Sequence, residues 1–145
     1  MIDLLRSTYQ NKKVFLTGHT GFKGSWMLAV LNFLGAEVKG FALAAEDKPA
    51  LFTLLNGDSL CDSLIADINN LSKITEEVKQ FQPDFIFHFA AQSLVRRSYT
   101  EPINTFNTNA IGTANLLEAM KGLDNECVVV IVTTDKVYKN LEHNF

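Results

Sequence analysis

Three glycines spaced three residues apart stand near the start of the chain, at Gly18, Gly21 and Gly24. They follow a short strand-like run at 14–16 and precede an apolar helix-like run at 25–34. Glycine at such positions permits a tight turn and lets the backbone approach a pyrophosphate closely. The helix that follows offers free N–H groups and a positive dipole end to the phosphates. This strand–loop–helix context favours a dinucleotide site over an ordinary glycine-rich turn.

Two further groups of small and polar residues follow apolar, strand-like runs. Ala90, Ala91, Gln92 and Ser93 come after the run at 85–89, and small residues there leave room for a ligand at the carboxyl end of a strand. The run 133–136 (Thr133, Thr134, Asp135, Lys136) carries neighbouring groups suited to hydrogen bonding and proton transfer. Packing of small residues and a solvated turn are the respective alternatives.

The end of the second strand lacks the acidic residue that usually binds the adenosine ribose. That stretch is Phe41 to Ala44, Glu46 and Asp47 come later, and no arginine stands there to favour a 2′-phosphate. The choice between NAD and NADP is therefore open on chemistry alone.

His19, His88 and several other polar residues differ in the roles that the sequence predicts for them. His19 lies in the glycine loop, where cofactor contact and a structural role are equally open. His88 lies in an apolar strand and is expected in the core. Asn109 is expected on a polar helix face turned toward the site, because asparagine is a poor helix former. The pair Arg96–Arg97 suits either a phosphorylated substrate or a solvated loop.

Strand and helix periods alternate along the chain. We expect strands at 14–16, 37–42, 63–66, 85–89 and 127–133, and helices at 25–34, 71–81 and 102–121 with a helical turn at 51–55. The first helix is apolar on almost all sides and is expected to be packed on several of them. In the last, residues 103, 106, 110, 117 and 120 are expected to mark one face. The order predicts an α/β fold, a Rossmann-type doubly wound parallel sheet of about five strands.

Composition bounds the class of protein. A length of 145 residues with 47% hydrophobic residues fits one domain, and 13 basic against 16 acidic residues argue against nucleic acid as a partner. Two cysteines form neither a disulfide framework nor a metal site. No apolar run approaches the roughly 20 residues of a membrane helix, and no signal peptide is visible. We therefore expect a cytoplasmic protein without metal or membrane contact.

Together these segments resemble the extended short-chain dehydrogenase/reductase family over nearly the whole chain. The order is the glycine motif, Asp67 after the third strand, the run 88–93, and the Asn-x-x-Gly-Thr-x-Asn pattern at 109–115. The segments 18–26 and 134–140 resemble the subfamily of CDP-glucose 4,6-dehydratases in particular.

The resemblance implies that NAD is the cofactor. It places Asp67 and Ile68 near adenine. Other cofactor-binding positions come from the glycine loop (Gly18, His19, Gly21, Phe22, Lys23, Gly24) and from the nicotinamide side (Phe89, Ala90, Ala91, Thr108, Thr133). It also assigns Gln92, Ser93 and Asn109 to the substrate.

The implied reaction is a redox-neutral dehydration of CDP-glucose to CDP-4-keto-6-deoxy-glucose, through transient oxidation at C4, loss of water across C5–C6 and return of the hydride to C6. Thr134 is implied to bond the C4 oxygen and Asp135 to protonate the leaving C6 hydroxyl. Lys136 stands where related dehydratases carry a glutamate base, so its pKa would have to fall well below ~10.4 for that role.

One departure from the family matters most. The catalytic Tyr-x-x-x-Lys pair is absent, because Tyr138 is followed four residues later by Glu142. We therefore expect this chain to be the N-terminal, NAD-binding part of a dehydratase, inactive alone, whose longer parent forms a homodimer. Another nucleotide-sugar 4,6-dehydratase or 4-epimerase of the family, and a non-catalytic NAD-binding module, are the alternatives.

Overall fold

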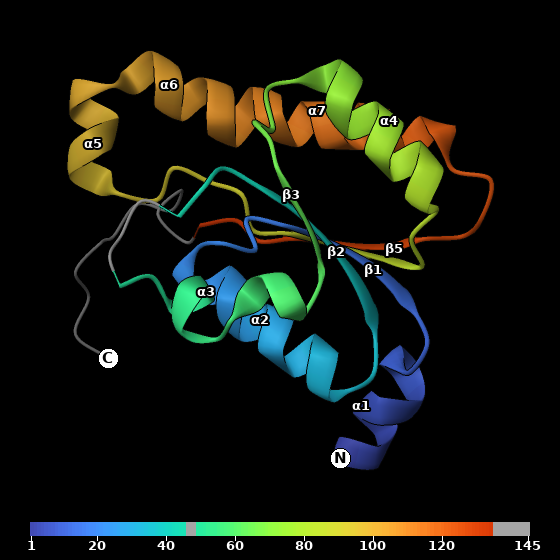
Figure 1. Ribbon diagram of the computed structural model, residues 1–145. Helices are drawn as coiled ribbons and strands as arrows, with labels where there is room; N and C mark the ends of the chain where they lie inside the picture. Colours follow the sequence, from blue (N-terminus) through green and yellow to red (C-terminus); the bar gives the residue numbers. More distant parts are fainter. Residues whose placement is uncertain (46–48, 135–145) are drawn as a thin grey trace, which may run out of the picture.

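Five parallel strands form the centre of the computed structural model, which describes residues 1–45 and 49–134 (Figure 1). Their order across the sheet is β3-β2-β1-β4-β5. The chain thus builds outward from β1 in one direction, returns, and builds outward in the other, so the connection reverses between β1 and β4. This is the expected doubly wound arrangement. The strands are β1 (Lys13–Thr17), β2 (Glu37–Ala42), β3 (Asp62–Ile65), β4 (Phe85–His88) and β5 (Val128–Ile131).

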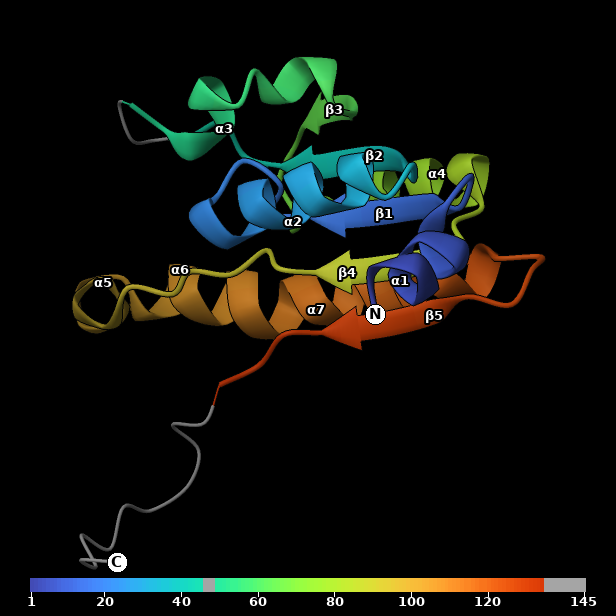
Figure 2. The same ribbon diagram turned by 90° about the horizontal axis from the view of Figure 1, so that it is seen from below.

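Helices cover both faces of the sheet (Figures 1 and 2). One face carries α1 (Ile2–Tyr9), α2 (Phe22–Phe33), the short α3 (Leu51–Leu54) and the 3-10 turn η1 (Gly57–Ser59). The other carries α4 (Leu71–Phe81) and α7 (Gly112–Ala119), which pack against each other. Helix α5 (Val95–Thr100) lies beyond the carboxyl ends of the strands.

The strand period of two divides the core into two apolar clusters. On β1, Val14 and Leu16 join the cluster under α2, while Phe15 joins the cluster under α4 and α7. All three side chains are completely buried. Because β1 is buried on both faces, it reads in the sequence as an uninterrupted apolar run.

Helix α4 has the bounds expected from its sequence. Its apolar positions recur on one face, where Ile74 and Val78 are fully buried. The side chain of Asn70 accepts a hydrogen bond from the backbone N–H of Lys73 at 3.1 Å and so caps the first turn. Gln82 then takes a left-handed conformation and ends the helix before Pro83.

The long helix expected at 102–121 is interrupted. It consists of α6 (Pro102–Phe106), a π-helical turn η2 (Asn107–Ile111), α7 and the 3-10 turn η3 (Met120–Gly122). Of the residues expected to mark one face, Ile103, Phe106, Ala110 and Leu117 are exposed and Met120 packs against the core. The fully buried positions are Leu116 and Ala119 instead. A π turn takes more residues than an α turn, so the faces of the helix before and after it no longer follow one α-helical period.

The expectation that α2 is packed on several sides is wrong. Leu28 and Leu31 face the sheet and are buried, but Trp26, Val30 and Phe33 are 53%, 46% and 61% exposed. Residues three and four apart share a helix face, so these three form an apolar stripe on the side away from the sheet. Composition alone could not show this, because it does not say how many faces have a partner. The sequence also gave no sign of α1 or α5.

The exposed edge of the sheet at β5 predicts self-association of the chain. In β5, Val128 and Val130 are 57% and 42% exposed, and β5 is an edge strand with unpaired backbone groups. We expect the 145-residue chain to associate at high micromolar concentrations, because an edge strand with exposed apolar side chains can pair with a second copy. Analytical ultracentrifugation measures it, and the double substitution Val128→Lys/Val130→Lys should return the chain to a monomer. A monomeric wild-type chain at that concentration would refute the prediction.

In the parts of the chain that the structure describes, no helix is long and apolar enough to cross a membrane. Over the same residues, no three His, Cys, Asp or Glu side chains gather as a metal site.

Candidate functional site

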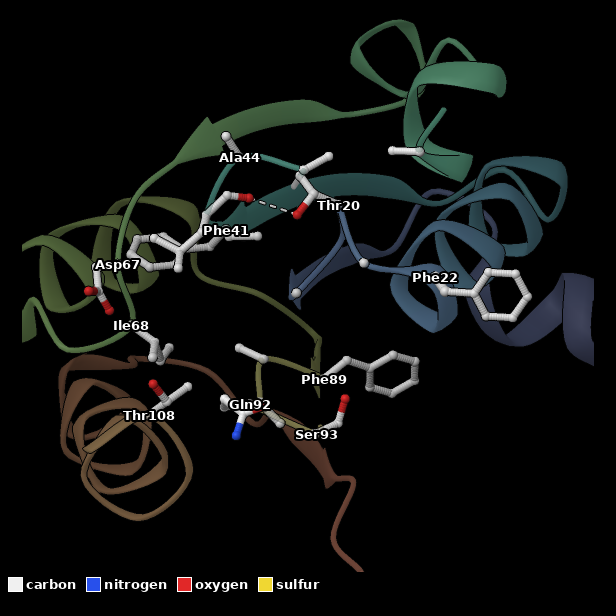
Figure 3. A pocket seen from close by; sticks show the side chains of 18 of the residues that line it. Thr20, Phe22, Phe41, Ala44, Asp67, Ile68, Phe89, Gln92, Ser93 and Thr108 are labelled. Carbon is white, nitrogen blue, oxygen red and sulfur yellow. Dashed lines mark hydrogen bonds between the residues drawn. The ribbon is translucent and has the colours of Figure 1, made fainter. Parts of the chain in front are cut away.

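A cavity of about 550 Å³ opens at the carboxyl ends of β1, β2, β3 and β4 (Figure 3). It has the size usual for a small-molecule site and lies where ligands bind in doubly wound sheets. The structure brings eleven of the expected site residues into its lining: Gly18, Gly21, Phe22, Asp67, Ile68, Phe89, Ala90, Ala91, Gln92, Ser93 and Thr108.

The glycine loop forms the floor between β1 and α2. Gly18 has a φ of +74°, and a Cβ there would lie 2.7 Å from the backbone nitrogen of Ala90. A Cβ on Gly24 would overlap the carbonyl oxygen of Gly18 and lie 2.9 Å from the Cα of His19. Both positions therefore exclude a side chain. Only that exclusion lets the start of the twelve-residue helix α2 approach the loop and direct its free N–H groups toward the cavity.

His19 does not direct its side chain into this cavity. The ring is completely buried, its Nε2 lies 2.8 Å from the hydroxyl of Ser63, and it meets the ring of Phe52 edge-on. Burial lowers the pKa of His19 to about 4, although the nearby Asp58 carboxylate works in the opposite direction. The neutral ring therefore ties the glycine loop to β3, and any contact of His19 with a cofactor would be through its backbone.

Other expected site residues lie outside the lining. Lys23 is exposed on α2, while Gly24 is buried beneath the loop. Thr133 and Thr134 follow β5 as exposed residues. Asp135 and Lys136 lie outside the described residues, and so do Glu46 and Asp47.

At one end of the cavity, the loop after β3 faces the end of β2 (Figure 3). Asp67 stands here, and one of its carboxylate oxygens accepts hydrogen bonds from the backbone and the side-chain amide of Asn69 at 2.9 and 3.0 Å. Opposite it, the hydroxyl of Thr20 donates to the carbonyl of Leu43 at 2.7 Å. Asp67 is the one acidic residue among the described lining residues. As expected from the sequence, the end of β2 contributes no carboxylate to this lining.

At the other end, the loop after β4 is held by bonds to its backbone. The hydroxyl of Thr17 accepts from the N–H groups of Phe89 and Ala90, each at 3.1 Å. The side-chain amide of Asn109 accepts from the N–H of Gln92 at 2.8 Å and donates to its carbonyl at 3.0 Å. Asn109 is thus bonded to the loop and does not line the cavity.

The Gln92 side chain is also bonded within the protein. Its amide oxygen accepts from the N–H of Leu94 at 2.7 Å, and its amide nitrogen donates to the hydroxyl of Thr105 at 2.9 Å. Ser93, which follows it, is exposed and lines the cavity.

Sequence reasoning missed several lining residues. Ala42, Leu43 and Ala44 could have been found, because Ala42 ends the strand at 37–42 and the other two follow it, just as Ala90 follows β4. Asn104 also lines the cavity, from α6, and was not expected there. Of the pair Arg96–Arg97, which the sequence offered for a phosphorylated substrate or a solvated loop, Arg97 lines the cavity on α5, a helix that no local pattern indicates. Arg97 pairs with Glu101 at 3.3 Å.

The sheet order and the cavity at the carboxyl ends of its strands define a domain of the Rossmann type, and comparison with known proteins identifies its family. The model of the GDP-mannose 4,6 dehydratase family matches residues 15–144. The chain belongs to this family of nucleotide-sugar 4,6-dehydratases and epimerases.

Individual relatives support this family assignment. CDP-glucose 4,6-dehydratase of Salmonella typhimurium is 47% identical over 142 residues, which are 98% of this chain and 39% of that protein. GDP-mannose 4,6-dehydratase of Vibrio cholerae is 32% identical over 88% of this chain and 36% of its own length. A UDP-glucose-4-epimerase from Stenotrophomonas maltophila, solved with bound NAD, superimposes with a TM-score of 0.78 at 24% identity, over 91% of this chain and 40% of its own, and so supports the fold. The chain therefore spans about two fifths of the length of these relatives.

Proposed function

We propose that the chain supplies the NAD-binding part of a nucleotide-sugar 4,6-dehydratase that converts CDP-glucose to CDP-4-keto-6-deoxy-glucose. The observation that carries the proposal is the glycine loop that lines the cavity, within a chain 47% identical to a CDP-glucose 4,6-dehydratase.

The described residues fit the cofactor. The closely packed glycines leave the loop backbone bare, and the start of α2 supplies N–H donors for a pyrophosphate. The cavity continues on one side to Asp67 and Ile68, which would contact adenine. It continues on the other to Ala90, Ala91 and Thr108, which would lie beside nicotinamide. With no acid at the end of β2, Asp67 is the described side chain best placed to accept a hydrogen bond from the adenosine part.

NAD would supply a hydride acceptor for C4 of the glucosyl unit and a donor for C6, which keeps the overall reaction redox-neutral. The residues after β5 would act on the sugar. Thr134 would bond the C4 oxygen, Asp135 would protonate the leaving C6 hydroxyl, and Lys136 would remove the C5 proton. A neutral lysine base requires a pKa well below its usual ~10.4, so its role depends on burial or on a neighbouring cation.

Two measurements test the proposal. Calorimetric titration of the 145-residue chain with NAD should show one site. The whole protein should then be offered CDP-glucose, dTDP-glucose, UDP-glucose and GDP-mannose separately, with formation of the 4-keto-6-deoxy sugar followed by its absorbance in alkali. We expect CDP-glucose to be the preferred substrate. Preference for another nucleotide sugar would refute the substrate assignment, and an epimerised product would refute the reaction.

The variant Asp135→Asn separates an enzyme from a binding module. In the whole protein it should abolish dehydration while NAD remains bound, because an amide cannot protonate the leaving hydroxyl. Full dehydration by this variant would remove Asp135 from the mechanism.

A further inference from the structure

Thr17, the last residue of β1, has a hydroxyl whose hydrogen-bonding capacity is completely used. A hydroxyl oxygen has two acceptor lone pairs and one proton. The N–H groups of Phe89 and Ala90 both donate to the Thr17 oxygen. Its proton is therefore left for the third partner, the Nδ1 of His88 at 2.7 Å. Since a backbone N–H can only donate, Nδ1 of His88 must accept.

This fixes the tautomer of His88. A neutral imidazole that accepts at Nδ1 carries its proton at Nε2. Nε2 lies 2.9 Å from the hydroxyl of Thr113, on the first turn of α7, so the ring donates there. His88 is only 2% exposed, and burial lowers its pKa to about 4, which keeps the ring neutral near pH 7.

The same direction of donation continues into the π turn. The hydroxyl of Thr113 donates its own proton to the carbonyl of Asn109 at 2.7 Å. Asn109 in turn holds the backbone of Gln92 with both atoms of its side-chain amide. A closed circuit results: the loop after β4 donates to Thr17, Thr17 to His88, His88 to Thr113 and Thr113 to Asn109, which bonds the loop again.

We propose that His88 and Thr113 are positioning residues for the nicotinamide half of the cavity, acting through this circuit of hydrogen bonds to fix the π turn against the loop of Phe89 to Gln92. This inference deepens the proposed function and rests on it. Neither His88 nor Thr113 lines the cavity, so each acts only through the residues that it holds.

The adenine half of the cavity is fixed separately. Asn115 lies on α7 two residues after Thr113, and its side-chain amide donates to the carbonyl of Ile68 at 3.1 Å. It has no part in the circuit. Asn115 therefore provides a matched control: it lies on the same helix within two residues of Thr113, yet it holds the opposite wall.

The experiment compares the affinity for NAD with that for ADP, which lacks the nicotinamide half. Thr113→Val keeps the shape of the side chain but removes the hydroxyl. This variant should lower the affinity for NAD about tenfold, the equivalent of about one strong hydrogen bond, and leave the affinity for ADP within about twofold of the wild-type value. Thr113→Ser should restore NAD affinity. Asn115→Ala should weaken NAD and ADP by the same factor.

Each result decides something. Equal losses of NAD and ADP in Thr113→Val, or no loss of either, would overturn the assignment to the nicotinamide half. Thermal unfolding of each variant checks that a lower affinity is not merely a lower folded fraction. If the wild-type chain bound neither nucleotide, the proposed function would fail. The circuit would then be decided by the ring ¹⁵N shifts of His88: a proton on Nε2 supports it, and a proton on Nδ1 overturns it.

Discussion

Replacing Gly24 with alanine is expected to weaken NAD binding by more than about 100-fold. The new Cβ would overlap the carbonyl oxygen of Gly18 and lie 2.7 Å from its carbonyl carbon. Both are backbone atoms in the middle of the glycine loop, so no flexible side chain can move aside. The loop or the start of α2 must shift, and the loss of two backbone hydrogen bonds to a charged pyrophosphate, at about 1.5 kcal/mol each, would weaken binding by more than about 100-fold.

Two other glycines provide a graded control. A Cβ on Gly21 would lie 3.4 Å from the Gly18 carbonyl oxygen, a contact relieved by a small adjustment, so Gly21→Ala should lose much less affinity. A Cβ on Gly122 would meet only the side chain of Lys79 at 3.7 Å or more, far from the cavity, and Gly122→Ala should bind normally. Calorimetric titration with NAD, alongside urea unfolding, measures the series. Gly24→Ala binding as tightly as Gly122→Ala would contradict the close packing of loop and helix.

Replacing Glu77 with alanine is expected to lower the free energy of unfolding by about 3 kcal/mol. Glu77 on α4 is 7% exposed and lies between two cations, with Lys73 at 2.7 Å and Lys39 at 2.9 Å. Lys39 projects from β2 and is itself largely buried, although it also reaches the exposed Asp62. Removing the carboxylate leaves the Lys39 ammonium partly buried without its main buried partner. Urea unfolding at pH 7 measures the loss.

Glu76 is the matched control, because it neighbours Glu77 and also pairs with Lys73, at 3.0 Å. Its side chain is 51% exposed, and exposed pairs contribute less than about 1 kcal/mol. Glu76→Ala should therefore be nearly neutral. Equal destabilisation by the two substitutions would show that the helix itself, rather than the buried carboxylate, is responsible.

The same carboxylate predicts how stability depends on pH. Burial alone would raise the pKa of Glu77, but hydrogen bonds from Lys73 and Lys39 outweigh it and hold the pKa below its usual value. A depressed carboxyl pKa contributes stability that is fully present above the unfolded value of about 4.3 and is lost as pH falls through the lower, folded value. Glu77→Gln should therefore lose less stability than wild type as pH falls below about 4.3, where the unfolded carboxyl takes up its proton more readily than the folded one. If the free energy of unfolding fell with pH by the same amount in wild type and Glu77→Gln, the prediction would be contradicted.

Local sequence determined the architecture and the glycine loop. Helix α4 and strand β2 have the expected bounds, because each is set by residues close together in the chain: an apolar period, an Asn70 cap, and Pro83 after the last turn. The alternation of these elements is enough to predict a doubly wound sheet, since parallel strands need crossover connections of one hand. Gly18, Gly21 and Gly24 stand out for the same reason, because their regular spacing falls within seven residues of the chain.

Tertiary structure decided what the individual side chains do. His19 and His88 read alike as histidines near a phosphate loop and a strand end, yet one bonds Ser63, 44 residues away, and the other Thr17, 71 residues away. The exposed stripe of α2 and the π turn beside Asn109 likewise depend on what packs against each helix. Burial and donor–acceptor matching are properties of residues distant in the chain and adjacent in space. They fix the direction of donation from Thr17 through His88 and Thr113 to Asn109, and no period or spacing in the sequence carries that information.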